Sequence, residues 1–245
     1  MSGSWIILLI ILVSSIPVIA VYFWFRIAKY QFSIVWFLFA LLAGAAAFIP
    51  ALILQDILTF SSVTQGRMAL LYEFFIRIAF TEEISRLLML IIFYFVAGFF
   101  SKQNVDKTGD GLPEVTTFNS VKKGMATGLI AGLGFALLES ARYASSSVDP
   151  GILLLRIFFT FPLHAACGSR VGAAAVLFRA FPIQAILRII TATAIHGVYN
   201  FLLELPFGIS AIAAFLIAVS AFFTAIISIK GGWNDNPALD KNDEN

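Results

Sequence analysis

Two adjacent glutamates, Glu82 and Glu83, stand with Arg86 in an otherwise apolar stretch that runs from Ile78 to Phe100. A charge at membrane depth costs about 2.5 to 3.5 kcal/mol on insertion scales, so such residues mark a functional site by default. Arg86 lies one turn after Glu82 and is expected to hold one carboxylate ionised, while Glu83 has no obvious counter-charge of its own. The pair therefore indicates general acid–base chemistry, with one carboxylate taking a proton from water.

Further polar groups occur inside other apolar segments, at Glu139, His164 and His196. Phe135 and Glu139 are spaced i,i+4 and share a helix face, as do His196 and Asn200. Asn200 is suited to orient His196 or to donate a hydrogen bond to a developing oxyanion. These residues are the candidates to complete a site with the glutamate pair.

The composition identifies the class of protein. Of the 245 residues, 60% are hydrophobic and only 12% are charged, and the mean hydropathy is +0.94. A soluble domain has about a quarter charged residues, so the chain is predicted to be a polytopic membrane protein made of α-helices. A net charge of +2 gives no indication of a nucleic-acid partner. The single cysteine, Cys167, excludes an intrachain disulfide and is interpreted as a buried, inert thiol.

Apolar runs of about 20 residues are long enough to cross a bilayer as helices. Seven such runs predict seven spans: Trp5 to Phe25, Phe32 to Leu54, Ile78 to Phe100, Val121 to Tyr143, Leu153 to Phe178, Ile183 to Leu203 and Ile209 to Ile229. The segment from Asp56 to Arg77, with Glu73 and Arg77 at i,i+4, is interpreted as an interfacial helix or an extension of the third span. An eighth span in this segment is left open.

The distribution of lysine and arginine predicts the orientation and the extent of the domain. Alternate connections carry the basic residues, which favours an N-terminus outside and a C-terminus in the cytoplasm. We expect a single transmembrane domain over residues 1–230, with its catalytic core at about 78–203, and a polar, disordered cytoplasmic tail over 231–245. The polar loop from Ser101 to Ser120 is expected to have no fold of its own.

The depth of the polar residues predicts one site. At 1.5 Å per residue, Glu139 lies about 6 Å and His196 about 10 Å from the outer ends of their spans, and His164 lies about 16 Å deep. Glu82 and Glu83 begin within two turns of the outer interface. The five groups are therefore expected to converge in the outer half of the bilayer. Small residues in the fourth span, at Gly128, Gly132 and Gly134, permit close helix approach there.

Four motifs in this order resemble the PrsW family of intramembrane proteases, distant relatives of the CAAX prenyl endopeptidases and the CPBP proteins. They are Glu82-Glu83-x-x-Arg86, the segment Gly134 to Tyr143 with Phe135-x-x-x-Glu139, His164, and His196-x-x-x-Asn200. The family pattern is written EExxK, FxxxE and HxxxD, so the chain departs from it at Arg86 and Asn200. The resemblance covers about Phe80 to Leu203.

The resemblance implies an endopeptidase of the bacterial cytoplasmic membrane that makes a site-1-type cut in a membrane-anchored regulatory protein, such as an anti-sigma factor. Glu82 or Glu83 would activate a water molecule, and the other expected catalytic residues are Glu139, His164, His196 and Asn200. Arg86 and Phe135 would support them.

The cofactor and the broader function each leave alternatives open. His164 and His196, with Glu139 or Glu83, would suit a Zn²⁺ ion with an open water position, but glutamate and histidine also activate water without metal. A proton-coupled transporter would bury similar groups, and a non-catalytic scaffold would keep the fold and lose the chemistry. In every case the lipid bilayer surrounds the chain.

Overall fold

The computed structural model describes residues 3–28, 30, 33–59, 66–105, 117–145, 150–205 and 208–230. These residues contain helices and no strand. The helices are α1 (Gly3–Ile27), α2 (Ile34–Ala46), α3 (Phe48–Ile57), α4 (Arg67–Leu71), the π-helix η1 (Tyr72–Phe80), α5 (Thr81–Val105), α6 (Thr117–Ser145), α7 (Pro150–Leu177), α8 (Pro182–Glu204) and α9 (Ile209–Lys230). The expectation of an all-helical bundle is confirmed.

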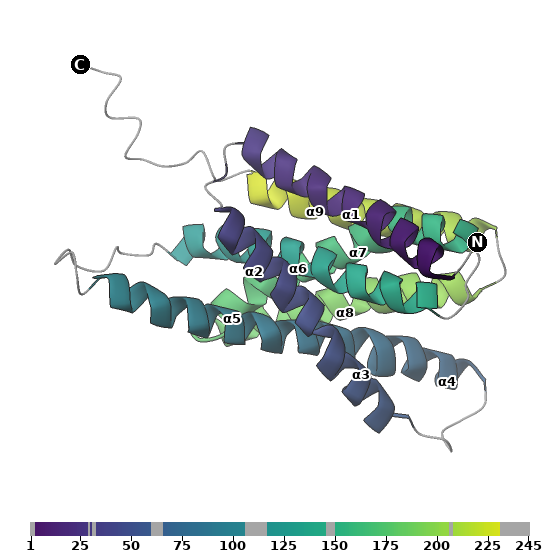
Figure 1. Cartoon of the computed structure of the whole chain (residues 1–245). Helices are drawn as coiled ribbons and strands as arrows, with labels where there is room; N and C mark the ends of the chain where they lie inside the picture. The colour runs from purple at the N-terminus through teal and green to yellow at the C-terminus, as the bar shows by residue number, and fades with distance from the viewer. Residues whose placement is uncertain are drawn as a thin grey trace.

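The long helices run side by side (Figure 1). Helix α1 begins at one end of the bundle, and α9 ends at the other. Within the described part of the chain, four helical segments are long and apolar enough to cross a membrane: Ile34–Ile57, Val121–Tyr143, Pro182–Glu204 and Ile209–Lys230. A shorter apolar helix covers Leu12–Ile27. The number of seven spans and the orientation of the termini stay predictions.

Helix α6 is the central element, in contact with α1, α2 and α7, and every residue from Gly124 to Ala136 is buried. Small side chains on α6 and α7 allow the two backbones to touch. A Cβ added at Gly128 would collide with the backbone of Gly168 and Gly172, and one at Gly132 would collide with the carbonyl group of His164. The predicted close approach of the fourth span is therefore confirmed, and it fixes the backbone of His164 against α6.

The second predicted span consists of two helices, because the chain bends between α2 and α3 at Ala47. Pro50 in the first turn of α3 has no N–H to donate to the carbonyl of Ala46, which accounts for the break. Ala47 and Ala51 pack against Phe135 of α6. The bend thereby brings the far end of α3 to the side of the bundle where α5 begins, as the contacts of α3 with α5 and η1 indicate.

The third predicted span begins earlier than Ile78, because helix is continuous from Arg67 through η1 to Val105. The alternative that the segment extends the third span is borne out for Arg67 to Arg77, whereas Asp56 belongs to α3. Arg77 Nε lies 2.7 Å from Glu73 Oε2, as the i,i+4 spacing indicated. The π-helix ends where Thr81 Oγ1 donates to the carbonyl of Arg77 at 2.6 Å or of Ile78 at 2.9 Å. The nine residues of π-helix end two residues before Glu82, and π-helical turns frequently occur at functional sites.

The expectation of a structureless loop from Ser101 to Ser120 is wrong at both of its ends. Residues 101–105 belong to α5 and residues 117–120 belong to α6. Residues 106–116 and the expected tail, residues 231–245, lie outside the described residues.

The contact between α6 and α7 generates a prediction about stability. Gly128→Val places a side chain against the backbone of α7, so we expect thermal unfolding in detergent to shift down by several degrees, for a loss of about 3 kcal/mol. Ala194→Val, which adds two carbon atoms where Gly128→Val adds three, lies at an exposed position of α8 and should leave the transition in place. Equal transitions for the two variants would contradict this packing.

Candidate active site

Two carboxylate–imidazole pairs form the framework of the site. His164 Nε2 on α7 lies 2.8 Å from Glu139 Oε2 on α6, and His196 Nδ1 on α8 lies 2.8 Å from Glu83 Oε1 on α5. An ionised carboxylate only accepts hydrogen bonds, so in each pair the ring N–H donates. Each neutral imidazole consequently keeps a lone pair on its other nitrogen, which is Nδ1 in His164 and Nε2 in His196.

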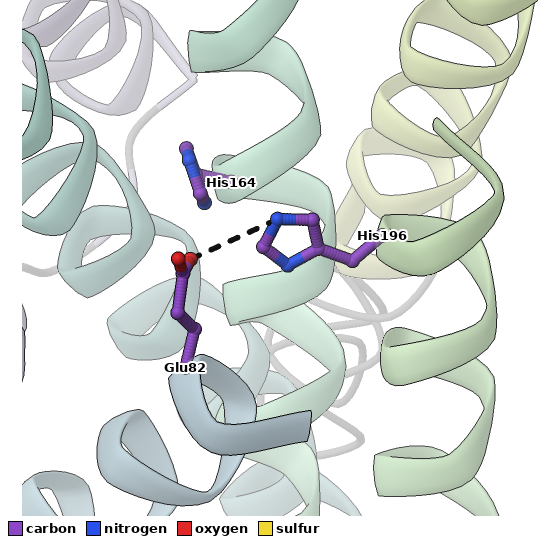
Figure 2. A group of neighbouring side chains, drawn as sticks. All are labelled: Glu82, His164 and His196. Atoms are coloured by element: carbon purple, nitrogen blue, oxygen red, sulfur yellow. Dashed lines mark ion pairs between the residues drawn. The ribbon is translucent and has the colours of Figure 1, made fainter. Parts of the chain in front are cut away.

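The third member of the cluster is Glu82. Its Oε2 atom lies 3.7 Å from His196 Nε2, and one possible ligand atom from each of Glu82, His164 and His196 lies within 4.8 Å of the others. Figure 2 shows the three side chains pointing toward one another from α5, α7 and α8. The rings of the two histidines are perpendicular, with centroids 5.1 Å apart. All three side chains are buried.

Arg86 is the counter-charge of Glu83, and this corrects the expectation that Glu83 has none. Arg86 Nη2 donates to Glu83 Oε1 in a short contact, whereas it lies 3.9 Å from Glu82 Oε2. The spacings i+3 and i+4 both place a partner on the same helix face, and the fully buried Arg86 selects the carboxylate at i−3. Glu82 is thereby left to the histidines.

Arg86 also connects the site to two neighbouring helices. Its Nη1 atom donates to the backbone carbonyl of His164 at 3.3 Å, and its guanidinium lies over the ring of Phe135, 4.8 Å from the centroid. The Phe135 ring in turn lies against the His164 ring, with centroids 5.2 Å apart. Phe135 therefore packs against the imidazole of His164, while Arg86 holds the backbone of the same residue.

A cavity of about 230 Å³ opens onto the cluster. It is lined by all of the expected catalytic residues except one, namely by Glu82, Glu139, His164, His196 and Asn200. The exception is Glu83, whose side chain has no exposed surface, whereas that of Glu139 is 15% exposed. Since Glu82 and Glu139 line this cavity and Glu83 does not, they are the carboxylates placed to contact a substrate.

Three cavity residues were missed by reasoning from sequence. Gln55 Nε2 donates to Glu82 Oε1 at 3.1 Å, and Thr160 Oγ1 lies 3.4 Å from Tyr199 Oη. Gln55 comes just after the predicted end of the second span and was therefore counted outside the membrane. Thr160 could have been found, because it precedes His164 by one helical turn in an apolar segment.

Cys167 takes no part in the cluster. It is buried, and its thiol lies 3.5 Å from the backbone carbonyl of Ala192. The interpretation of an inert buried thiol agrees with this position.

The donor set fits a metal ion. Two imidazoles and one carboxylate are a common set of protein ligands for catalytic Zn²⁺, with a further position left for water. Two of the three atoms that such a set requires, Glu82 Oε2 and His164 Nδ1, are buried and make no hydrogen bond to any residue that the structure describes. Each histidine also donates the N–H of its other ring nitrogen to a carboxylate, which is the usual arrangement around zinc-binding histidines. The grouping differs from the ligand set expected from sequence, because Glu82 takes the place given there to Glu139 or Glu83.

A family model described as PrsW family intramembrane metalloprotease matches residues 33–227, which is most of the chain. The chain belongs to this family. The protein is thus a membrane-embedded protease, and the transporter and scaffold alternatives are set aside. The PrsW match also extends beyond the expected core of 78–203, so that α2, α3 and α9 are part of the family domain. No curated protein and no solved structure matches the chain.

The buried ion pair of this PrsW protein generates a prediction about stability. Arg86→Gln leaves the carboxylate of Glu83 buried without its counter-charge, so we expect the free energy of unfolding in mixed micelles to fall by about 3 to 5 kcal/mol. Arg86→Lys keeps the positive charge, as the lysine of the family pattern does. It should lower the free energy of unfolding by clearly less than Arg86→Gln.

The matched control is Arg77→Gln, which breaks the partly exposed pair with Glu73. This change should cost about 1 kcal/mol or less. The assignment of Arg86 would be contradicted if Arg86→Gln and Arg77→Gln had the same effect.

Proposed function

We propose that this chain is a multi-pass zinc endopeptidase of the bacterial cytoplasmic membrane, and that it makes a site-1-type cut in a membrane-anchored regulatory protein resembling an anti-sigma factor. The observation that carries the proposal is the convergence of Glu82, His164 and His196 beside a cavity, with a carboxylate behind each histidine. These three residues hold the metal. When bound, Zn²⁺ supplies Lewis-acid polarisation of the scissile carbonyl and of the attacking water.

Glu139 acts as the general base. It lines the cavity, and its side chain is the most exposed of the three site carboxylates. As the water oxygen bonds to the carbonyl carbon, Glu139 takes one water proton, and it returns this proton to the amine nitrogen when the C–N bond breaks. The carboxylate retains lone pairs for this purpose while Oε2 accepts from His164.

The remaining cavity residues bind and orient. Asn200 follows His196 by one turn on α8 and lines the same cavity, so its amide can donate to the oxygen that becomes negative during attack. Gln55 holds Oε1 of Glu82 and thereby turns Oε2 toward His196. Glu83 and Arg86 do not line the cavity and act through His196 and the backbone of His164.

The position of the residues that line the cavity supports a cut close to the membrane surface. Besides the cluster, the cavity is lined by residues near the ends of α6 and α8, at Arg142, Tyr143, Leu203 and Glu204. His196 stands eight residues, or about 12 Å, from the end of α8. A substrate segment just outside its own membrane span can reach that depth, which suits a single-span protein.

The distribution of charge supports a cut on the extracytoplasmic side of the membrane. Basic residues gather at the bundle end opposite to the mouth of the cavity, at Arg26, Lys122, Lys123, Arg179 and Lys230. Cytoplasmic ends carry the excess of lysine and arginine, so the cavity opens on the extracytoplasmic side.

The test is cleavage in a defined membrane. The purified full chain is reconstituted in liposomes with single-span candidate substrates, and products are identified by mass spectrometry. We expect the wild type to produce a fragment cut beside the substrate's span, and Glu82→Gln to lower the rate by about 10³-fold or more, because several kcal/mol of transition-state stabilisation are lost.

Glu73→Gln is the control, since it removes a partly exposed carboxylate on the neighbouring turns of helix without touching the cluster. The proposal is wrong if Glu82→Gln cleaves at the rate of Glu73→Gln.

A further inference from the structure

A second polar groove, about 390 Å³ in volume, lies between α7 and α8. It is lined by Arg170, Gln184, Leu187, Arg188 and Thr191. The residues from α8 follow a helical spacing of three and four, so they form one stripe that faces Arg170 of α7. None of the lining residues is acidic, and the groove is separate from the cavity of the active site, with which it shares no residue.

The two arginines of the groove differ in their contacts. Arg170 donates to the carbonyls of Ala166 and Ala221 and to Thr224 Oγ1, at 2.9, 3.5 and 3.1 Å, and so fastens α7 to α9. Arg188 is half-buried and has no hydrogen bond or ion pair to any residue that the structure describes. One guanidinium is therefore anchored and the other is available to a ligand.

Arg188 lies on α8, which is long and apolar enough to cross a membrane, and Arg170 lies on α7, which packs against α8. Arg170 stands seven residues before the end of α7, and Arg188 six residues after the start of α8, which corresponds to depths of about 10 and 9 Å. Positive charges at this depth are costly unless they are paired, and arginines near a helix end extend toward the headgroup region. No carboxylate in the groove pairs with them.

We propose that this groove binds the phosphate of an anionic phospholipid. Guanidinium groups bind phosphate oxygens through paired, charge-assisted hydrogen bonds, and the amide of Gln184 adds another donor. Two positive charges with no carboxylate among the described residues of the groove favour a headgroup of net negative charge over a zwitterionic one, whose own cation would lie beside the arginines.

The surface beside the groove fits the acyl chains of such a lipid. Four large apolar side chains on α8 are more than half exposed: Ile183, Ile186, Leu187 and Ile190. An exposed aliphatic face next to a cationic groove suits a glycerophospholipid and offers nothing to a free phosphate ion. The occupant is thus a membrane lipid.

The experiment measures lipid binding to the purified full chain by native mass spectrometry, with phosphatidylglycerol, phosphatidylcholine or inorganic phosphate as the probe. Arg188→Gln is the variant of choice, because Arg188 makes no hydrogen bond that supports the fold, unlike Arg170. Lys230→Gln is the control, since it removes the same charge from the exposed last residue of α9.

We expect phosphatidylglycerol to bind more tightly than phosphatidylcholine, and Arg188→Gln to weaken phosphatidylglycerol binding about fivefold, while Lys230→Gln leaves it unchanged. Inorganic phosphate should not compete. The proposal is overturned if the two lipids bind equally, if Lys230→Gln has the effect of Arg188→Gln, or if inorganic phosphate displaces the lipid. Because the assay involves no proteolysis, its result is independent of the proposed active site.

Discussion

The rest of the active site depends on the hydrogen bonds that the buried carboxylate of Glu83 accepts. This carboxylate accepts hydrogen bonds from Arg86 of its own helix and from His196 of α8, while Arg86 donates to the backbone of His164 on α7. Three helices are thereby held in register by one charge pair that has no access to water. A buried ion pair adds little net stability, because both charges lose their contact with water. Removing one partner is nevertheless strongly destabilising, because the other charge is left buried and unpaired. The main effect of the pair is therefore to fix the positions of the residues around it.

This network requires the backbones of α6 and α7 to lie unusually close. Gly128 and Gly132 allow α6 to touch the α7 backbone, and the carbonyl of His164 lies against Gly132. Glu139 then follows two turns later on α6, at the distance from which it accepts a hydrogen bond from His164. The glycines therefore act on the chemistry indirectly, because they set the separation between the first imidazole and its carboxylate.

Much of this arrangement could be predicted from the residues. The apolar runs located the helices, and the depths of Glu82, Glu139, His164 and His196 indicated one site. The partner of Arg86 could not be predicted, since i+3 and i+4 neighbours share a face. The role of Gln55 was hidden for a different reason: it depends on the bend at Ala47, which the hydropathy of a continuous apolar run does not reveal.

We propose that Glu82, His164 and His196 hold one metal ion. Elemental analysis by inductively coupled plasma mass spectrometry tests this, on the dialysed wild type beside the His164→Ala/His196→Ala double variant. We expect about one zinc per wild-type chain and a loss of that zinc in the double variant. A wild type without zinc, or a double variant that retains it, would show that these residues hold no zinc and would favour water activated by glutamate alone.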